Sequence, residues 1–63
     1  MTVKRVLKAA EIRGIYLNPK KQWINNFIGY GYSFYSPYGG LNQADTLNGI
    51  YRQIMKYPKT SNN

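Results

Sequence analysis

The chain has 63 residues, enough for one small domain, and it contains neither cysteine nor histidine. It therefore lacks disulfides, thiolate ligands and an imidazole base, and its two carboxylates are too few for a supported acid–base pair. We expect no enzyme activity, no metal and no cofactor. Nine lysines and arginines give a net charge of +7. This charge favours a polyanionic partner, although a basic surface also serves solubility alone.

Three observations concern the compartment of the protein. No apolar run approaches the roughly 20 residues that cross a bilayer, and no apolar segment follows the basic start as in a secretory signal. The lack of cysteine fits a reducing compartment. We therefore expect no membrane span and a location that is cytoplasmic or associated with the nucleoid or nucleus.

The first ten residues have apolar side chains at helical spacing. These are Val3, Val6, Leu7 and Ala10. The segment is too short for this spacing to decide between a short helix and a basic arm that orders on binding. In both cases the cations Lys4, Arg5 and Lys8 lie away from the apolar stripe.

Three β-strands are predicted next. Residues 11–17 are rich in β-branched and aromatic side chains, and residues 22–28 alternate in polarity, so each is typical of a strand. Between them, residues 18–21 combine Asn, Pro and two lysines, which favours a hairpin turn. Residues 29–36 alternate again and predict a third strand.

The alternation assigns side chains to the two faces of this sheet. Trp23 and Phe27 share one face, and we expect them in the core. A second group is expected either in the core or on an aromatic binding surface: Tyr30, Tyr32 and Phe34. Tyr16 and Tyr35 are expected on the open face of the sheet.

A helix is predicted over residues 43–56, after the breaker at residues 37–40. Its apolar stripe consists of Leu47, Ile50, Tyr51 and Ile54, at positions i, i+3, i+4 and i+7. Asn42 or Asp45 is expected to cap the helix, and Pro58 to end it. Leu47, Ile50 and Ile54 are expected to be buried against the sheet.

These elements together predict an α+β fold in the order β-β-β-α. A small three-stranded antiparallel sheet would pack on one C-terminal helix, which suffices to cover one face of the sheet. Residues 1–10 would form the basic arm or short helix, residues 11–57 the sheet-plus-helix domain, and residues 58–63 a disordered tail.

One motif extends over much of the predicted domain. Arg13-Gly14-Ile15, Pro19 and Trp23 follow the spacing R-G-[VI]-x-x-x-P-x-x-x-W. Over residues 13–55 the chain resembles the plant ethylene-responsive-element-binding domain, whose fold also occurs in the arm-binding domains of phage-type tyrosine integrases. Further matches to the family's L-G-x-F, A-E and A-Y-D segments are Tyr38-Gly39-Gly40-Leu41, Ala44-Asp45 and Tyr51. The resemblance implies the same β-β-β-α order and DNA binding through the sheet.

The resemblance also identifies positions that would face DNA. In the family, arginines and tryptophans on the sheet enter the major groove; here Arg13 is retained and Lys20 keeps a positive charge. The remaining positions are uncharged: Tyr16, Asn18, Asn26, Ile28, Tyr35 and Pro37. Because arginine is the commonest bidentate reader of guanine, the resemblance supports the fold more than sequence-specific reading.

We therefore predict a small nucleic-acid-binding protein of phage or mobile-element type. DNA is favoured over RNA, with duplex DNA bound by a basic, tyrosine-rich sheet face. The residues expected to hold phosphates are Arg13, Lys20, Lys21, Lys4 and Arg5. Those expected to contact bases or sugars are Tyr16, Asn18, Asn26 and Tyr35.

The alternative is a protein-binding module, such as a small inhibitor or assembly factor. In that case the tyrosine-rich face docks on an acidic protein. Composition does not separate the two functions, because tyrosine and arginine are enriched at protein-binding hot spots as well.

Overall fold

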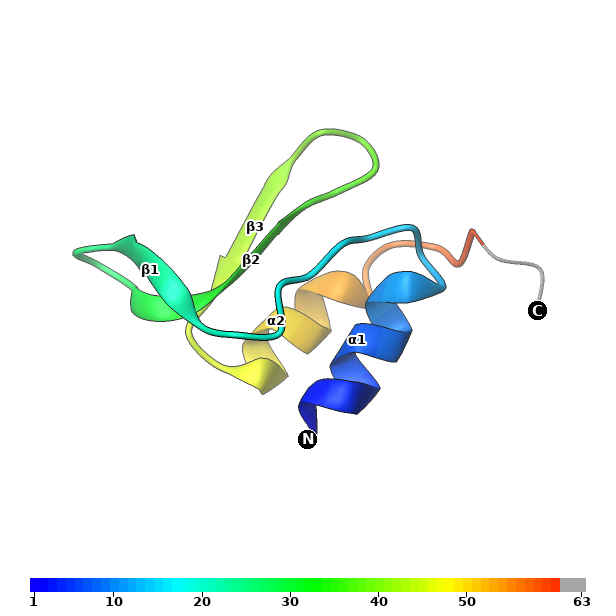
Figure 1. Cartoon of the computed structure of the whole chain (residues 1–63). Coiled ribbons are helices and arrows are strands. Elements are labelled where there is room, and N and C mark those ends of the chain that lie inside the picture. Colours follow the sequence, from blue (N-terminus) through cyan, green and yellow to red (C-terminus); the bar gives the residue numbers. More distant parts are fainter. Residues whose placement is uncertain (61–63) are drawn as a thin grey trace.

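The computed structural model describes residues 1–60 of the chain. Its elements, in order, are α1 (Val3–Glu11), β1 (Gln22–Asn25), β2 (Gly29–Tyr35), β3 (Leu41–Ala44) and α2 (Leu47–Ile54). The strands form an antiparallel sheet in the order β1-β2-β3, and both helices lie on one side of it (Figure 1). The predicted α+β fold, with a three-stranded antiparallel sheet and a C-terminal helix, is confirmed.

The N-terminal segment is a helix rather than an arm. The Thr2 hydroxyl accepts a hydrogen bond from the backbone N–H of Arg5 at 3.2 Å, which caps the first turn of α1. Val6, Ala9 and Ala10 are buried, whereas the cations of this helix point outward. The amphipathic spacing seen in the sequence is therefore used to pack α1 against the rest of the domain.

The strand predicted over residues 11–17 is absent, and so is the hairpin it would form with β1. Glu11 ends α1, and the chain turns back so that the N–H of Ile15 donates to the Ala10 carbonyl at 2.9 Å. Residues 15–17 are unpaired with any strand, yet Ile15 and Leu17 are buried in the core. Their β-branched and apolar side chains serve packing rather than sheet pairing.

The third strand is instead β3. It follows the breaker predicted at residues 37–40 and overlaps the first residues of the predicted helix. The breaker is the turn of a hairpin: the Ser36 hydroxyl accepts from the N–H groups of Tyr38 at 3.1 Å and Gly40 at 3.0 Å. Gly39 adopts φ of +93°, a left-handed conformation that favours glycine. β3 then pairs with β2 from Tyr35↔Leu41 to Tyr32↔Ala44.

Helix α2 begins four residues later than expected. Its N-cap is Thr46, whose hydroxyl accepts from the N–H of Gly49 at 3.0 Å, so neither Asn42 nor Asp45 is the cap. Asn42 belongs to β3, and Asp45 lies in the bend before the helix.

The segment after α2 returns to the end of α1. The backbone N–H of Thr60 donates to the Ile12 carbonyl at 2.9 Å. Of the tail expected over residues 58–63, the described part is thus hydrogen-bonded to the domain, and residues 61–63 lie outside the described residues.

The core lies between the two helices, the extended segment and β2. Its buried members are Val6, Ala9, Ala10, Ile15, Leu17, Tyr32, Phe34, Ile50 and Ile54. The predicted burial of Ile50 and Ile54 is confirmed, and Leu47 is partly buried at the periphery.

The predicted burial of Trp23 and Phe27 is wrong. These side chains are 56% and 97% exposed. The turn end of the β1–β2 hairpin extends beyond the helices (Figure 1), so Trp23 and Phe27 lie outside the core.

Replacing Ile50 by alanine should strongly destabilise the domain. Its side chain has no exposed surface, and a buried Ile→Ala change costs about 2–5 kcal/mol. That is comparable to the whole stability of a domain of this size. Ile50→Val, with an expected cost of about 0.5–1.5 kcal/mol, keeps the measurement possible if the alanine variant does not fold.

Chemical denaturation measures both changes in the free energy of unfolding. Leu41→Ala is the control, because half of that side chain is already exposed on β3. A loss of stability in the control as large as that of Ile50→Ala would contradict this description of the core.

Candidate nucleic-acid interface

The cationic residues of the chain all lie outside the strands. Residues 22–44, which contain β1, β2 and β3, carry no charged side chain. The expectation that one sheet face would be both basic and tyrosine-rich is therefore wrong. The positive charge is instead concentrated on the helices and on the segments that follow them.

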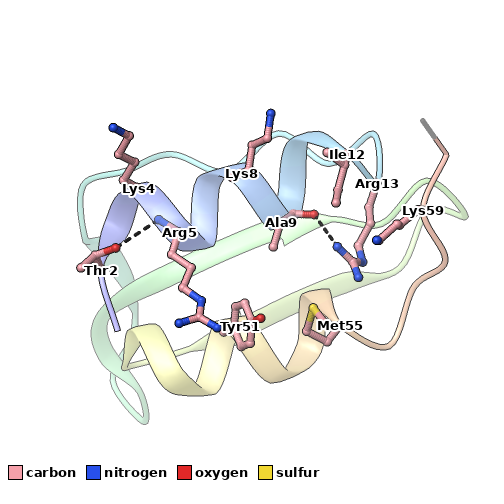
Figure 2. A pocket seen from close by; sticks show the side chains of 10 residues that line it. All are labelled: Thr2, Lys4, Arg5, Lys8, Ala9, Ile12, Arg13, Tyr51, Met55 and Lys59. Carbon is pink, nitrogen blue, oxygen red and sulfur yellow. Dashed lines mark hydrogen bonds between the residues drawn. The ribbon is translucent and has the colours of Figure 1, made fainter. Parts of the chain in front are cut away.

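A groove of about 490 Å³ lies between α1 and α2 (Figure 2). Five of the residues that line it are cationic: Lys4, Arg5, Lys8, Arg13 and Lys59. The others are Thr2, Ala9, Ile12, Tyr51 and Met55. Within residues 1–60, neither carboxylate of the sequence lines this groove.

The helical geometry explains how the cations gather. Lys4 and Lys8 are one turn apart on α1 and point outward along its edge, whereas Arg5 reaches across toward Tyr51 of α2 (Figure 2). Lys8 is 3.8 Å from the Glu11 carboxylate, but both side chains are largely exposed, so this ion pair is weak. The ion pair therefore neutralises little of the positive charge around the groove, and this charge can attract an external anion.

Arg13 is the exception, because its side chain is only 6% exposed. Its Nε donates to the Tyr57 carbonyl and an Nη to the Ala9 carbonyl, each at 2.9 Å. The guanidinium therefore joins the end of α1 to the segment after α2. It is not on the sheet, which does not fit the predicted role in reading bases.

Four other predicted site residues lie along the segment that connects α1 to β1. Tyr16 is 81% exposed, and Lys20 and Lys21 are also exposed. The Asn18 side-chain oxygen accepts from the N–H of Lys20 at 2.9 Å, so this asparagine shapes the turn. These residues do not line the groove between the helices.

The last two predicted residues, Asn26 and Tyr35, lie at opposite ends of the β1–β2 hairpin. Asn26 is in its turn, and Tyr35 is the last residue of β2, where it pairs with Leu41. At about 3.3 Å per residue, the length of β2 separates them by roughly 20 Å. Of all the residues predicted to bind nucleic acid, only Lys4, Arg5 and Arg13 meet in one groove.

The sequence-based prediction missed the side of the groove that α2 contributes. Tyr51 was assigned to the apolar stripe of the helix and Lys59 to the tail, yet both line the groove. No local pattern indicates this, since the two residues face α1 only after the chain has folded back on itself.

The exposed aromatic residues of the hairpin were also missed, but here the sequence contained a signal. Asn25, Asn26 and Gly29 are turn-forming residues on both sides of Phe27, and they favour a turn over the continuous strand that was predicted.

Among residues 1–60 there is no group of three acidic, histidine or cysteine side chains that could hold a metal ion. No helix in this part of the chain is long and apolar enough to cross a membrane. No protein-family model, curated protein or solved structure matches the chain.

Arg13→Ala should lower stability rather than remove a base contact. The change deprives the Tyr57 and Ala9 carbonyls of a charged donor, and such hydrogen bonds are worth about 1.5–3 kcal/mol. Arg13→Lys should recover only part of this, because an ammonium group cannot reproduce the planar fork of a guanidinium. Thermal or chemical denaturation gives the values. Unchanged stability together with lost DNA affinity would show that Arg13 contacts a DNA base instead.

Proposed function

We propose that this protein binds nucleic acid, with duplex DNA as the favoured target, and holds the phosphate backbone in the groove between α1 and α2. The observation that carries the proposal is the set of five cationic side chains around that groove, without a carboxylate among its described lining residues. A groove lined by charges of one sign attracts a polyanion and raises its local concentration.

The parts of the groove suit a phosphate backbone. Arg5 presents a guanidinium that can donate two parallel hydrogen bonds to one phosphate, and Lys4 and Lys8 supply point charges beside it. Tyr51 and Met55 provide an apolar floor that suits the sugar edge of a strand. Arg13 also adds positive charge, although its side chain is buried, and no acidic side chain of the described residues pairs with it.

Binding of this kind positions a protein on DNA without reading its sequence. Phosphate contacts carry no direct sequence information, whereas base edges are read by hydrogen-bonding side chains. We therefore propose that the affinity of this protein is largely independent of DNA sequence. The resemblance to the ethylene-responsive-element-binding domain, the phage or mobile-element origin and the cytoplasmic or nucleoid location stay predictions.

A second candidate function is the binding of an acidic protein. Its support is a group of exposed apolar side chains at the β2–β3 end of the sheet: Tyr35, Tyr38 and Leu41. Such residues are common at protein interfaces. This end of the sheet is uncharged, however, so it offers no electrostatic attraction to an acidic protein.

The test is a titration of duplex DNA across a series of salt concentrations. For a protein that contacts Z phosphates, log K falls with log salt with a slope of about −0.9Z. The double variant Lys4→Ala/Arg5→Ala should therefore bind more weakly and have a slope shallower by roughly 1.8. The loss should be the same for unrelated DNA sequences.

Lys56→Ala is the matched control, because Lys56 is exposed but does not line the groove. Its slope should equal that of the wild type if the groove is the site. Lack of measurable duplex binding by the wild type at ~0.15 M salt would refute the proposal, and an acidic protein partner would then be the remaining candidate.

A further inference from the structure

The turn end of the β1–β2 hairpin projects from the body of the protein (Figure 1). None of its residues 22–30 is buried. We refer to residues 22–30 of this hairpin as the β-arm. β1 makes its contacts with β2 rather than with either helix. The β-arm is therefore not needed to complete the core, and its side chains are free to contact a ligand.

Phe27 is the outermost apolar group of the β-arm, with 97% of its side chain exposed. The turn that carries it is held in place by Asn25, whose side-chain oxygen accepts from the N–H groups of Phe27 at 2.9 Å and Ile28 at 2.8 Å. Gly29 follows with φ of +79° and completes the turn. The ring is thus presented by an ordered turn, so little backbone entropy is lost when it binds.

The base of the β-arm is braced by a second aromatic contact. Trp23 and Tyr30 are directly opposite each other in the sheet, and their rings meet edge to face with centroids 5.4 Å apart. Cross-strand aromatic pairs of this kind stabilise a two-stranded ribbon that is otherwise marginal in water. Both rings remain more than half exposed.

The charge around the β-arm indicates its partner. The arm itself is uncharged, while Lys20 and Lys21 immediately precede it and are exposed. A ligand that satisfies both features has anionic groups for the lysines and planar apolar surfaces for the rings. Nucleic acid has this chemistry, with phosphates outside and stacked bases inside.

A membrane surface fits less well. Phe27 and Ile28 share a hollow with the carboxylate-bearing Asp45, and bringing a carboxylate toward the apolar interior of a bilayer is costly. Base edges, in contrast, carry amino groups that can donate to a carboxylate. A single projecting phenylalanine also offers little apolar area for a bilayer, yet one such side chain is enough to separate two base pairs.

We infer that Phe27 is a wedge that inserts between adjacent base pairs of duplex DNA, and that this insertion kinks the duplex. The inference rests on the proposed function. Phenylalanine suits the task because its ring has no polar atom to desolvate, and the neighbouring Trp23 and Tyr30 can contact the groove wall. Insertion of apolar side chains kinks duplexes by about 20–90°.

The experiment measures the end-to-end distance of a short duplex that carries a donor and an acceptor dye at its ends. Wild-type protein should shorten this distance. Phe27→Ala should bind with the same salt dependence but leave the duplex straight, and its affinity should fall about 5-fold or more, as expected for a lost stacking contact. Phe27→Leu should restore part of the kink, since leucine also acts as a wedge.

Tyr38→Ala is the control, because Tyr38 is a similarly exposed aromatic residue in the other hairpin. It should kink DNA like the wild type. A second readout is the fluorescence of Trp23, the single tryptophan of the chain, which should be quenched by duplex DNA and unaffected by anionic phospholipid vesicles.

The outcomes separate the two proposals. If the wild type does not bind duplex DNA, both the proposed function and the wedge are refuted. If it binds but the duplex stays straight and Phe27→Ala behaves as the wild type, the wedge alone is refuted. A blue shift of Trp23 emission with vesicles, without quenching by DNA, would assign the β-arm to a membrane surface and likewise overturn the inference.

Discussion

The buried guanidinium of Arg13 is the contact on which the arrangement of the helical layer depends. It donates to the Ala9 carbonyl near the end of α1 and to the carbonyl of Tyr57, which follows α2 and lies 44 residues after Arg13 in the chain. The chain has no cysteine, so no disulfide holds these ends together. Together with the hydrogen bond from the Thr60 N–H to the Ile12 carbonyl, this contact holds the segment after α2 against the end of α1, where Lys59 lines the groove.

The separation of charge from aromatic surface follows from this arrangement. The helices turn their apolar stripes inward, and the α1 cations Lys4, Arg5 and Lys8 face outward around the groove, whereas the strands carry no charge at all. In the proposed binding mode, the helical groove contacts phosphates and the β-arm contacts bases. Substitutions in one can be made without disturbing the other, because the core of Val6, Ile50 and Ile54 lies between the helices and β2.

Local patterns predicted the elements well where one face of an element is buried and the other exposed. The stripe of Ile50 and Ile54 identified α2, and the alternation of Tyr32 and Phe34 with polar neighbours identified β2. The prediction was wrong for residues 11–17, because Ile15 and Leu17 alternate as in a strand but pack into the core without a pairing partner. The prediction also missed β3. The four residues of β3 form a strand only because they pair with β2, which lies beside them.

The sequence by itself determined the α+β class, the two apolar stripes, the excess of positive charge and the absence of cysteine and histidine chemistry. These properties depend on composition or on neighbours a few residues apart. Only the tertiary structure decided that Arg13 is buried, that Lys59 joins Lys4 and Arg5 around one groove, and that Phe27 is exposed rather than buried. The physical reason is that burial and clustering depend on which distant segments pack together, and periodicity within one segment carries no information about its partner.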